Sequence, residues 1–199
     1  MRSSRYTYTL AALDADGFAN DLTGAGPFTT FGAPADGTAH QTTLASAANL
    51  SAITMTVVGT DANNNVQTEA IAGPAANTVN LTKYFKTITS ITPSATLGAN
   101  TMDVGWTALV QTPIIPVDPY KLTGPLLTVG VGGTCTFTAQ QTNANVFDLS
   151  ITPTWATLGS AGASATAMTL ANAGTTGVRV TVASHTSGIL TLDITQARV

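Results

Sequence analysis

The chain has 199 residues, a net charge of −3 at pH 7 and only 9% charged residues, against about 25% in an average soluble domain. A protein that grips nucleic acid through its phosphates needs clustered Lys and Arg, so this composition argues against that class. No segment approaches the roughly 20 apolar residues of a membrane helix, and the basic N-terminus lacks the apolar region of a secretory signal. We therefore expect a protein that is made in a cytoplasm and binds neither nucleic acid nor membrane.

The composition favours an all-β fold. Thr, Ala and Gly dominate, whereas Glu occurs once and Lys three times. Thr is β-branched and suits a pleated surface, while Glu and Lys are the usual residues of exposed helix faces. Charge normally keeps protein surfaces apart, so a surface coated with Thr and Ser fits a protein that works in an assembly. The single cysteine, Cys135, excludes an internal disulfide, and we expect it to be a small buried hydrophobe in a strand.

Residues 1–49 are predicted to form an N-terminal arm and an irregular segment. Apolar residues alternate with Thr over 2–10, which predicts a short strand or an extended arm, and 14–17 has the composition of a turn. Residues 19–46 are rich in Gly, Pro and Thr, and we expect them to become ordered against something else. The candidate partner-binding residues are the arginines and aromatic residues of this region: Arg2, Arg5, Tyr6, Tyr8, Phe18, Phe28 and Phe31.

Residues 50–110 are predicted to form the first β module. The alternation over 50–59, a turn of Asp and Asn at 61–65, and a return over 66–71 indicate a hairpin. One or two strands follow over 79–91, and a strand over 102–109 closes the module. Residues 111–125 contain four prolines, which remove backbone donors and predict a linker between modules.

Residues 126–199 are predicted to form the second β module. The turn residues Gly132 and Gly133 suggest a hairpin between 126–131 and 134–140. A strand is expected over 146–151, and 156–173 fits either a loop with a short strand or one poor helix. The last strands are expected over 177–183 and 188–194, with a turn between them. The fold class is thus all-β: two small antiparallel β-sandwich or barrel-like modules with an extended N-terminal arm.

A short sequence echo connects the two modules. Ser90-Ile-Thr-Pro-Ser-Ala-Thr-Leu-Gly98 is similar to Ser150-Ile-Thr-Pro-Thr-Trp-Ala-Thr-Leu-Gly159, with one residue inserted. Either the modules are related, or the bias toward Thr and Ala produces a chance similarity. If the echo is structural, Pro93 and Pro153 should each end a strand at the same place in its sheet.

No motif of known catalytic chemistry occurs in the chain. It lacks the nucleophile elbow, the phosphate-binding loop, the His-Glu-x-x-His pattern and paired cysteines. The two histidines, His40 and His185, are expected in loops of different modules, and His185 in a hairpin turn. The two tryptophans are expected in cores or at contact surfaces, where a large ring with one donor suits a half-wet position. We expect a protein that is not an enzyme and uses no cofactor.

Two acidic loops resemble cation sites in part. The first is Asp61, Asn63 and Asn65, and the second is Asp14, Asp16 and Asp21. The first has the initial spacings of a calcium loop but lacks its glycine and its distal Glu. Asp and Asn also dominate ordinary turns, because they bond their own backbone. We therefore expect turns and no bound metal.

Several β patterns resemble small structural proteins of tailed bacteriophages. They are Thr54-Met-Thr-Val-Val-Gly-Thr-Asp61 with Gln67-Thr-Glu69, Thr82-Lys-Tyr-Phe-Lys-Thr-Ile-Thr-Ser-Ile-Thr-Pro-Ser94, Cys135-Thr-Phe-Thr-Ala-Gln-Gln-Thr142, Asn145-Val-Phe-Asp-Leu-Ser-Ile-Thr-Pro-Thr-Trp155, Val178-Arg-Val-Thr-Val182 and Leu190-Thr-Leu-Asp-Ile-Thr-Gln196. The resemblance covers roughly residues 50–199. It implies a non-enzymatic virion protein, with no catalytic residues to carry over.

The resemblance leads to the expectation of a capsid decoration or cement protein on the virion surface, made in the cytoplasm of a host bacterium. Its partners would be the major capsid protein and copies of itself, as a homotrimer. The arm and the module surfaces would clamp neighbouring capsid subunits, because strand addition needs no charged recognition. One alternative is a neck or tail adaptor or fibre-base protein. Another is a carbohydrate- or receptor-binding β module, which exposed aromatic platforms would favour.

Overall fold

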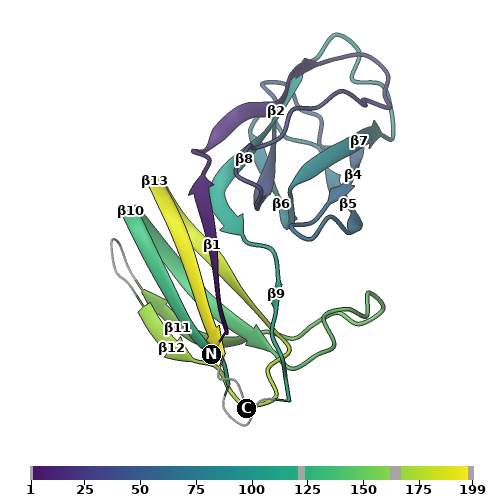
Figure 1. Cartoon of the computed structure of the whole chain (residues 1–199). Helices are drawn as coiled ribbons and strands as arrows, with labels where there is room; N and C mark the ends of the chain where they lie inside the picture. The colour runs from purple at the N-terminus through teal and green to yellow at the C-terminus, as the bar shows by residue number, and fades with distance from the viewer. Residues whose placement is uncertain (1, 121–123, 162–166, 197–199) are drawn as a thin grey trace. The chain divides into compact units, whose positions relative to one another are not determined.

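The computed structural model describes residues 2–120, 124–161 and 167–196, and this part of the chain contains strands, turns and irregular segments but no helix. The strands pair into a ten-stranded antiparallel sheet and a separate three-stranded sheet, and neither closes into a barrel. The prediction of an all-β fold is therefore confirmed, whereas barrel-like modules are absent from these residues. The chain divides into two compact units, Met1–Leu10 with Gln111–Val199 and Ala11–Val110 (Figure 1). We call the first the discontinuous unit and the second the continuous unit.

The continuous unit contains seven strands, the last of which ends one residue beyond it: β2 (Asp14–Leu22), β3 (Ala39–Ala45), β4 (Thr54–Thr60), β5 (Val66–Ala72), β6 (Thr78–Phe85), β7 (Thr87–Pro93) and β8 (Met102–Gln111). The described part of the discontinuous unit contains β1 (Arg2–Leu10), β9 (Ile115–Pro116), β10 (Leu126–Thr142), β11 (Ala156–Ala161), β12 (Ala167–Leu170) and β13 (Gly177–Gln196).

The three-stranded sheet of the continuous unit has the order β5-β4-β7. The predicted hairpin is confirmed, because β4 pairs with β5 from Thr54↔Ala72 to Thr60↔Val66. The period-two pattern of β4 explains its placement: Met55 and Val57 are fully buried, while the intervening Thr56 is only half-buried. These two side chains join a core that also receives apolar residues from β3, β6, β7 and β8. The second predicted segment, 79–91, forms two strands, β6 and β7.

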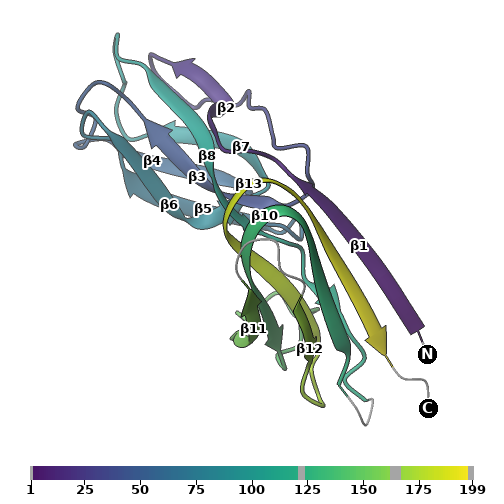
Figure 2. The same cartoon turned by 90° about the vertical axis from the view of Figure 1, so that its left-hand side faces the viewer.

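Two long strands, β10 and β13, form the centre of the discontinuous unit (Figure 2). They pair antiparallel from Leu126↔Thr195 to Thr142↔Gly177. The predicted hairpin turns at Gly132-Gly133 and around His185 are therefore wrong, since each segment continues as one strand. The glycines lie opposite Ile189 and Gly188, and the register shifts twice just after them, so they bend the ladder rather than reverse it.

Residues 1–49 are divided between the two units. β1 pairs with β13 from Arg2↔Gln196 to Leu10↔Gly188, so residues 2–10 form a strand of the ten-stranded sheet within the discontinuous unit. Residues 14–22 form β2, where a turn was expected at 14–17. The segment that follows is ordered against its own unit: Phe28 forms a β-bridge with Ile91, and the N–H of Gly32 donates to the carbonyl of Phe18. Backbone pairing inside the chain thus orders residues that have a weak sequence pattern.

The strand expected over 146–151 is absent, because two successive turns form there. The N–H of Asp148 donates to the carbonyl of Asn145, and the N–H of Ile151 donates to the carbonyl of Asp148. These two backbone N–H groups therefore donate within turns and do not pair with a neighbouring strand. Pro93 ends β7, but Pro153 ends no strand, since β11 begins only at residue 156. The two prolines therefore do not occupy equivalent strand ends, and the similarity of residues 90–98 to residues 150–159 does not reflect a structural repeat.

Candidate functional site

The candidate residues of the N-terminal segment that lie in β1 are on the discontinuous unit. Arg2 is opposite Gln196 at one end of the strand. Arg5 makes a two-pronged contact with Asp193, with Nε–Oδ1 at 2.7 Å and Nη2–Oδ2 at 2.9 Å. The hydrogen bonds and attraction between the two charges raise the pKa of Arg5, and those from Arg5 lower the pKa of Asp193. Tyr6 is 37% exposed, whereas Tyr8 is half-buried, and burial raises its pKa.

The three candidate phenylalanines belong to the core of the continuous unit or pack against it. Phe18 is 2% exposed, and its ring meets Trp106 edge-on with centroids 5.0 Å apart. Phe28 and Phe31 are partly buried against the same core. Burying these rings removes apolar area from water within the unit. The seven candidate residues are thus divided between the two units, and Phe18 offers almost no accessible surface.

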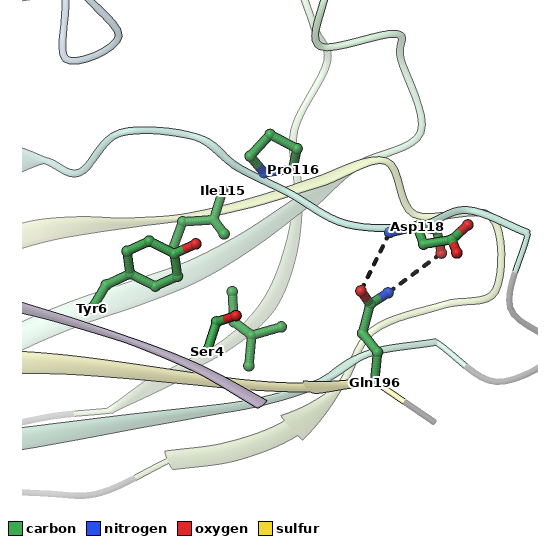
Figure 3. A pocket seen from close by; sticks show the side chains of 7 residues that line it. Ser4, Tyr6, Ile115, Pro116, Asp118 and Gln196 are labelled. Atoms are coloured by element: carbon green, nitrogen blue, oxygen red, sulfur yellow. Dashed lines mark hydrogen bonds between the residues drawn. The ribbon is translucent and has the colours of Figure 1, made fainter. Parts of the chain in front are cut away.

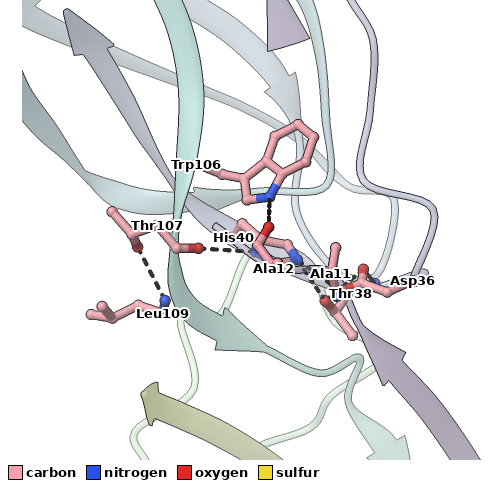
Figure 4. Close-up of polar contacts among 8 residues, drawn as sticks. All are labelled: Ala11, Ala12, Asp36, Thr38, His40, Trp106, Thr107 and Leu109. Atoms are coloured by element: carbon pink, nitrogen blue, oxygen red, sulfur yellow. Dashed lines mark hydrogen bonds and ion pairs between the residues drawn. The ribbon is translucent and has the colours of Figure 1, made fainter. Parts of the chain in front are cut away.

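The continuous unit contains a buried polar cluster that sequence reasoning missed (Figure 4). His40 was expected in a loop but lies in β3 and is 0% exposed. Its Nε2 is 2.8 Å from Oδ2 of Asp36, and its Nδ1 is 3.2 Å from the carbonyl oxygen of Thr107. The hydroxyl of Thr38 donates to Oδ1 of Asp36 at 2.8 Å. Asp36, Thr38 and His40 recur every second residue, and this period-two spacing of polar residues was the available signal.

The electrostatics of the cluster hold Asp36 ionised. Burial by itself raises the pKa of this carboxyl, but the hydrogen bond from His40 and those from the N–H groups of Ala11 and Thr38 outweigh burial and lower the pKa to about 2. Both ring nitrogens of His40 face acceptors, a carboxylate and a carbonyl. The side chains of His40 and Asp36 are 0% and 1% exposed, so the cluster is closed to a substrate. The cluster therefore stabilises the fold and is not a catalytic site.

The first of the two acidic loops that partly resemble cation sites, residues 61–65, is a turn between β4 and β5, as expected. Oδ1 of Asp61 accepts the N–H groups of Asn63 and Asn65, both at 2.8 Å, and Oδ2 accepts the amide of Asn65 at 3.1 Å. This carboxylate is therefore committed to the backbone of its own loop. Across residues 2–120, 124–161 and 167–196, no group of three or more His, Cys, Asp or Glu residues could hold a metal ion.

Cys135 and His185 lie opposite each other in the pairing of β10 with β13. Cys135 is 1% exposed, and burial raises the pKa of its thiol, which keeps it in the unreactive protonated form. The prediction of a small buried hydrophobe is confirmed. His185 is 7% exposed within β13, so the prediction that it occupies a turn is wrong.

A loop of the discontinuous unit exposes several large apolar side chains. Residues 143–155 join β10 to β11, and we call them the 143–155 loop. Phe147 is 77% exposed, Leu149 is 75% exposed and Ile151 is 44% exposed. Oδ1 of Asn145 accepts the N–H of Phe147, and Oδ1 of Asp148 accepts the N–H of Ser150, so side-chain caps hold the loop in this form. The 143–155 loop is therefore a candidate contact surface.

A small pocket of about 140 Å³ lies between β1, β9 and β13 of the discontinuous unit (Figure 3). Tyr6 and Ile115 line it from β1 and β9. The side chain of Gln196 closes one end, because it exchanges two hydrogen bonds of 3.4 Å with the backbone of Asp118. Ligand sites in proteins usually enclose about 300–1,000 Å³, so this pocket is too small for such a ligand.

Searches against protein families, curated proteins and solved structures found no match for this chain. Within the part of the chain that the structure describes, no helix is long and apolar enough to cross a membrane.

Proposed function

We propose that this chain is a non-enzymatic structural protein of a tailed-bacteriophage virion. In this proposal it is a decoration or cement protein on the capsid surface that clamps neighbouring major-capsid subunits, with the two units acting as small β-sandwich modules. The observation that carries the proposal is the group of exposed apolar residues Phe147, Leu149 and Ile151 on one loop of a weakly charged protein. Covering these side chains with an assembly partner would remove their apolar surface from water and so stabilise the complex. The resemblance of residues 50–199 to phage structural proteins points to a virion as that assembly.

A second contact would use the outer edge of β1. Among the described strands, β1 is hydrogen-bonded to β13 alone. An edge strand presents unpaired N–H and C=O groups, and an extended segment of a capsid subunit could add to it without charged recognition. Tyr6 on this strand is partly exposed and would contribute apolar contact next to the new strand. This edge replaces the free arm of the sequence prediction, because residues 2–10 are already paired within the chain.

The principal alternative is a neck or tail adaptor or fibre-base protein, which would use the same surfaces. The two positions differ in copy number, since a head carries many copies and a neck or tail carries one ring. We therefore propose to count copies of this chain per major-capsid subunit in purified particles, and to locate them by electron microscopy. Many copies over the head support decoration, a single ring supports the alternative, and absence from particles contradicts both.

The apolar contact can be tested by adding purified chain back to particles that lack it. The double variant Phe147→Ser with Leu149→Ser should lose most particle binding, because it removes two exposed apolar side chains without changing charge. Val66→Ser is the matched control, since Val66 is 78% exposed but lies on β5 of the other unit. Equal occupancy by the wild-type chain and the double variant would contradict this contact. Light scattering would check the proposed homotrimer against three times the 20.1 kDa chain.

A further inference from the structure

A second, larger pocket in the discontinuous unit is lined by neutral side chains and one tryptophan. Its volume is about 310 Å³, and it lies where the end of β10 meets the start of β11. One aromatic ring and four types of neutral side chain line it: Gln141, Thr142, Asn143, Thr154, Trp155, Ala156 and Asn172. We propose that this pocket, which we call the Trp155 pocket, binds a neutral saccharide. The proposal does not depend on the virion function proposed above.

The aromatic side chain of the pocket is held by a cation. The guanidinium of Arg179 lies over the ring of Trp155, 3.9 Å from its centroid. Nε of Arg179 in turn donates to Oε1 of Gln140 at 2.8 Å. The stacked cation fixes one face of the indole. Trp155 lines the pocket and is half-buried. Apolar C–H faces of sugar rings pack well on such an aromatic surface.

The polar side chains of the pocket are also held by hydrogen bonds within the protein. Oε1 of Gln141 accepts the N–H of Asn172 at 2.8 Å and the hydroxyl of Thr175 at 3.0 Å. Gln141 is only 5% exposed, so these bonds fix the direction of its amide. The hydroxyl of Thr142 accepts the N–H of Ala144 at 3.1 Å, which fixes the backbone turn where Asn143 sits. Polar groups that are ordered in advance reduce the entropy lost on binding.

The charge and size of the pocket select the class of ligand. None of the seven lining residues is titratable, so an ionic ligand would lose its hydration without gaining a charged partner there. Amides and hydroxyls both donate and accept hydrogen bonds, which matches the hydroxyl groups of a sugar. The volume lies at the lower end of the range of about 300–1,000 Å³ for small-molecule sites. These properties together favour one or two neutral sugar units.

The test uses the full chain on an array of neutral oligosaccharides, followed by calorimetric titration with the saccharides that bind. Trp155→Ala should weaken binding about tenfold, because it removes the aromatic surface on which the sugar ring would pack. Asn143 is exposed, so Asn143→Ala should leave the fold intact and weaken binding by about 2- to 10-fold, the effect of one hydrogen bond. Phe147→Ala, on the same loop but outside the pocket, should bind like the wild-type chain.

Binding should also be the same at low and high salt, because no charged group lines the pocket. The proposal is overturned if no neutral saccharide on the array binds. It is also overturned if Trp155→Ala and Asn143→Ala both keep wild-type affinity, or if affinity falls steeply with salt. These readouts use purified chain alone, so they separate this proposal from the particle-binding test.

Discussion

Replacing Asp36 by Asn removes the negative charge that faces His40 inside the continuous unit. The side chain of Asp36 is 1% exposed, and its pKa is lowered from 3.8 to about 2. A difference of nearly two pKa units corresponds to about 2–3 kcal/mol of folding free energy, since each unit is worth about 1.4 kcal/mol. Because the folded pKa is the lower one, this stabilisation is complete above pH 3.8 and is lost as the pH falls toward 2. Asp36→Asn should therefore cost about 2–3 kcal/mol at neutral pH.

The assay is urea unfolding at a series of pH values, followed by tryptophan fluorescence. The chain has two tryptophans, Trp106 in the continuous unit and Trp155 in the discontinuous unit. A Trp155→Phe background leaves Trp106 as the single reporter of the unit that holds Asp36. In this background the wild-type chain should lose stability steeply between pH 4 and 2, and the Asp36→Asn chain should have a flatter profile.

Asp16→Asn is the control for this experiment. Asp16 lies in the same unit, but it is fully exposed, and a hydrogen bond with the neighbouring carboxyl of Asp14 raises its pKa. Its charge therefore opposes folding slightly, and its removal should not destabilise the unit at neutral pH. The reasoning is refuted if Asp36→Asn unfolds at the same urea concentration as its parent at pH 7. Equal acid sensitivity of the two chains below pH 4 would refute it as well.

Three further predictions concern single positions. A Cβ at Gly17 would overlap the ring of Trp106. Gly17→Ala should therefore destabilise the continuous unit by about 1–3 kcal/mol in the same urea assay. An unchanged urea concentration at the unfolding midpoint would contradict this packing. Cys135 is buried with a raised thiol pKa, so a thiol reagent should label it only after denaturant is added, and fast labelling of the folded chain would count against this. The ion pair of Arg5 with Asp193 is exposed, so Arg5→Ala should shift the thermal midpoint only slightly, and a large shift would show that β1 depends on this pair.

The predictions that succeeded rest on local pattern. The hairpin of residues 54–72 combines a period-two alternation with a turn rich in Asp and Asn, and both signals act over a few residues. The burial of Cys135 likewise follows from its place between two threonines in a strand pattern. By contrast, Gly132 and Gly133 have turn chemistry but lie inside β10. A glycine pair permits either a turn or a bend, and the choice depends on whether a partner strand continues past it.

The candidate site shows the same division. The sequence led to the hypothesis that aromatic and arginine residues near the N-terminus bind a partner, but it could not tell which of them would be buried. Phe18 lies in a core because β2 pairs with β8, more than eighty residues away along the chain. The Trp155 pocket brings together residues from the end of β10, the start of β11 and Asn172. No local pattern connects these segments, so the pocket was invisible before the fold was known.

Composition and short-range periodicity were enough to predict an all-β chain. Alternating apolar residues and β-branched Thr favour a strand in any part of the sequence, because side chains in a strand point alternately to its two faces. The tertiary structure alone decided the length of β10 and β13, the pairing of β1 with β13, and the burial of the Asp36–His40 pair. The physical reason is that each of these features depends on hydrogen bonds or charge contacts between segments. An isolated segment with the same residues has no means of specifying which distant strand, carboxylate or carbonyl will meet it.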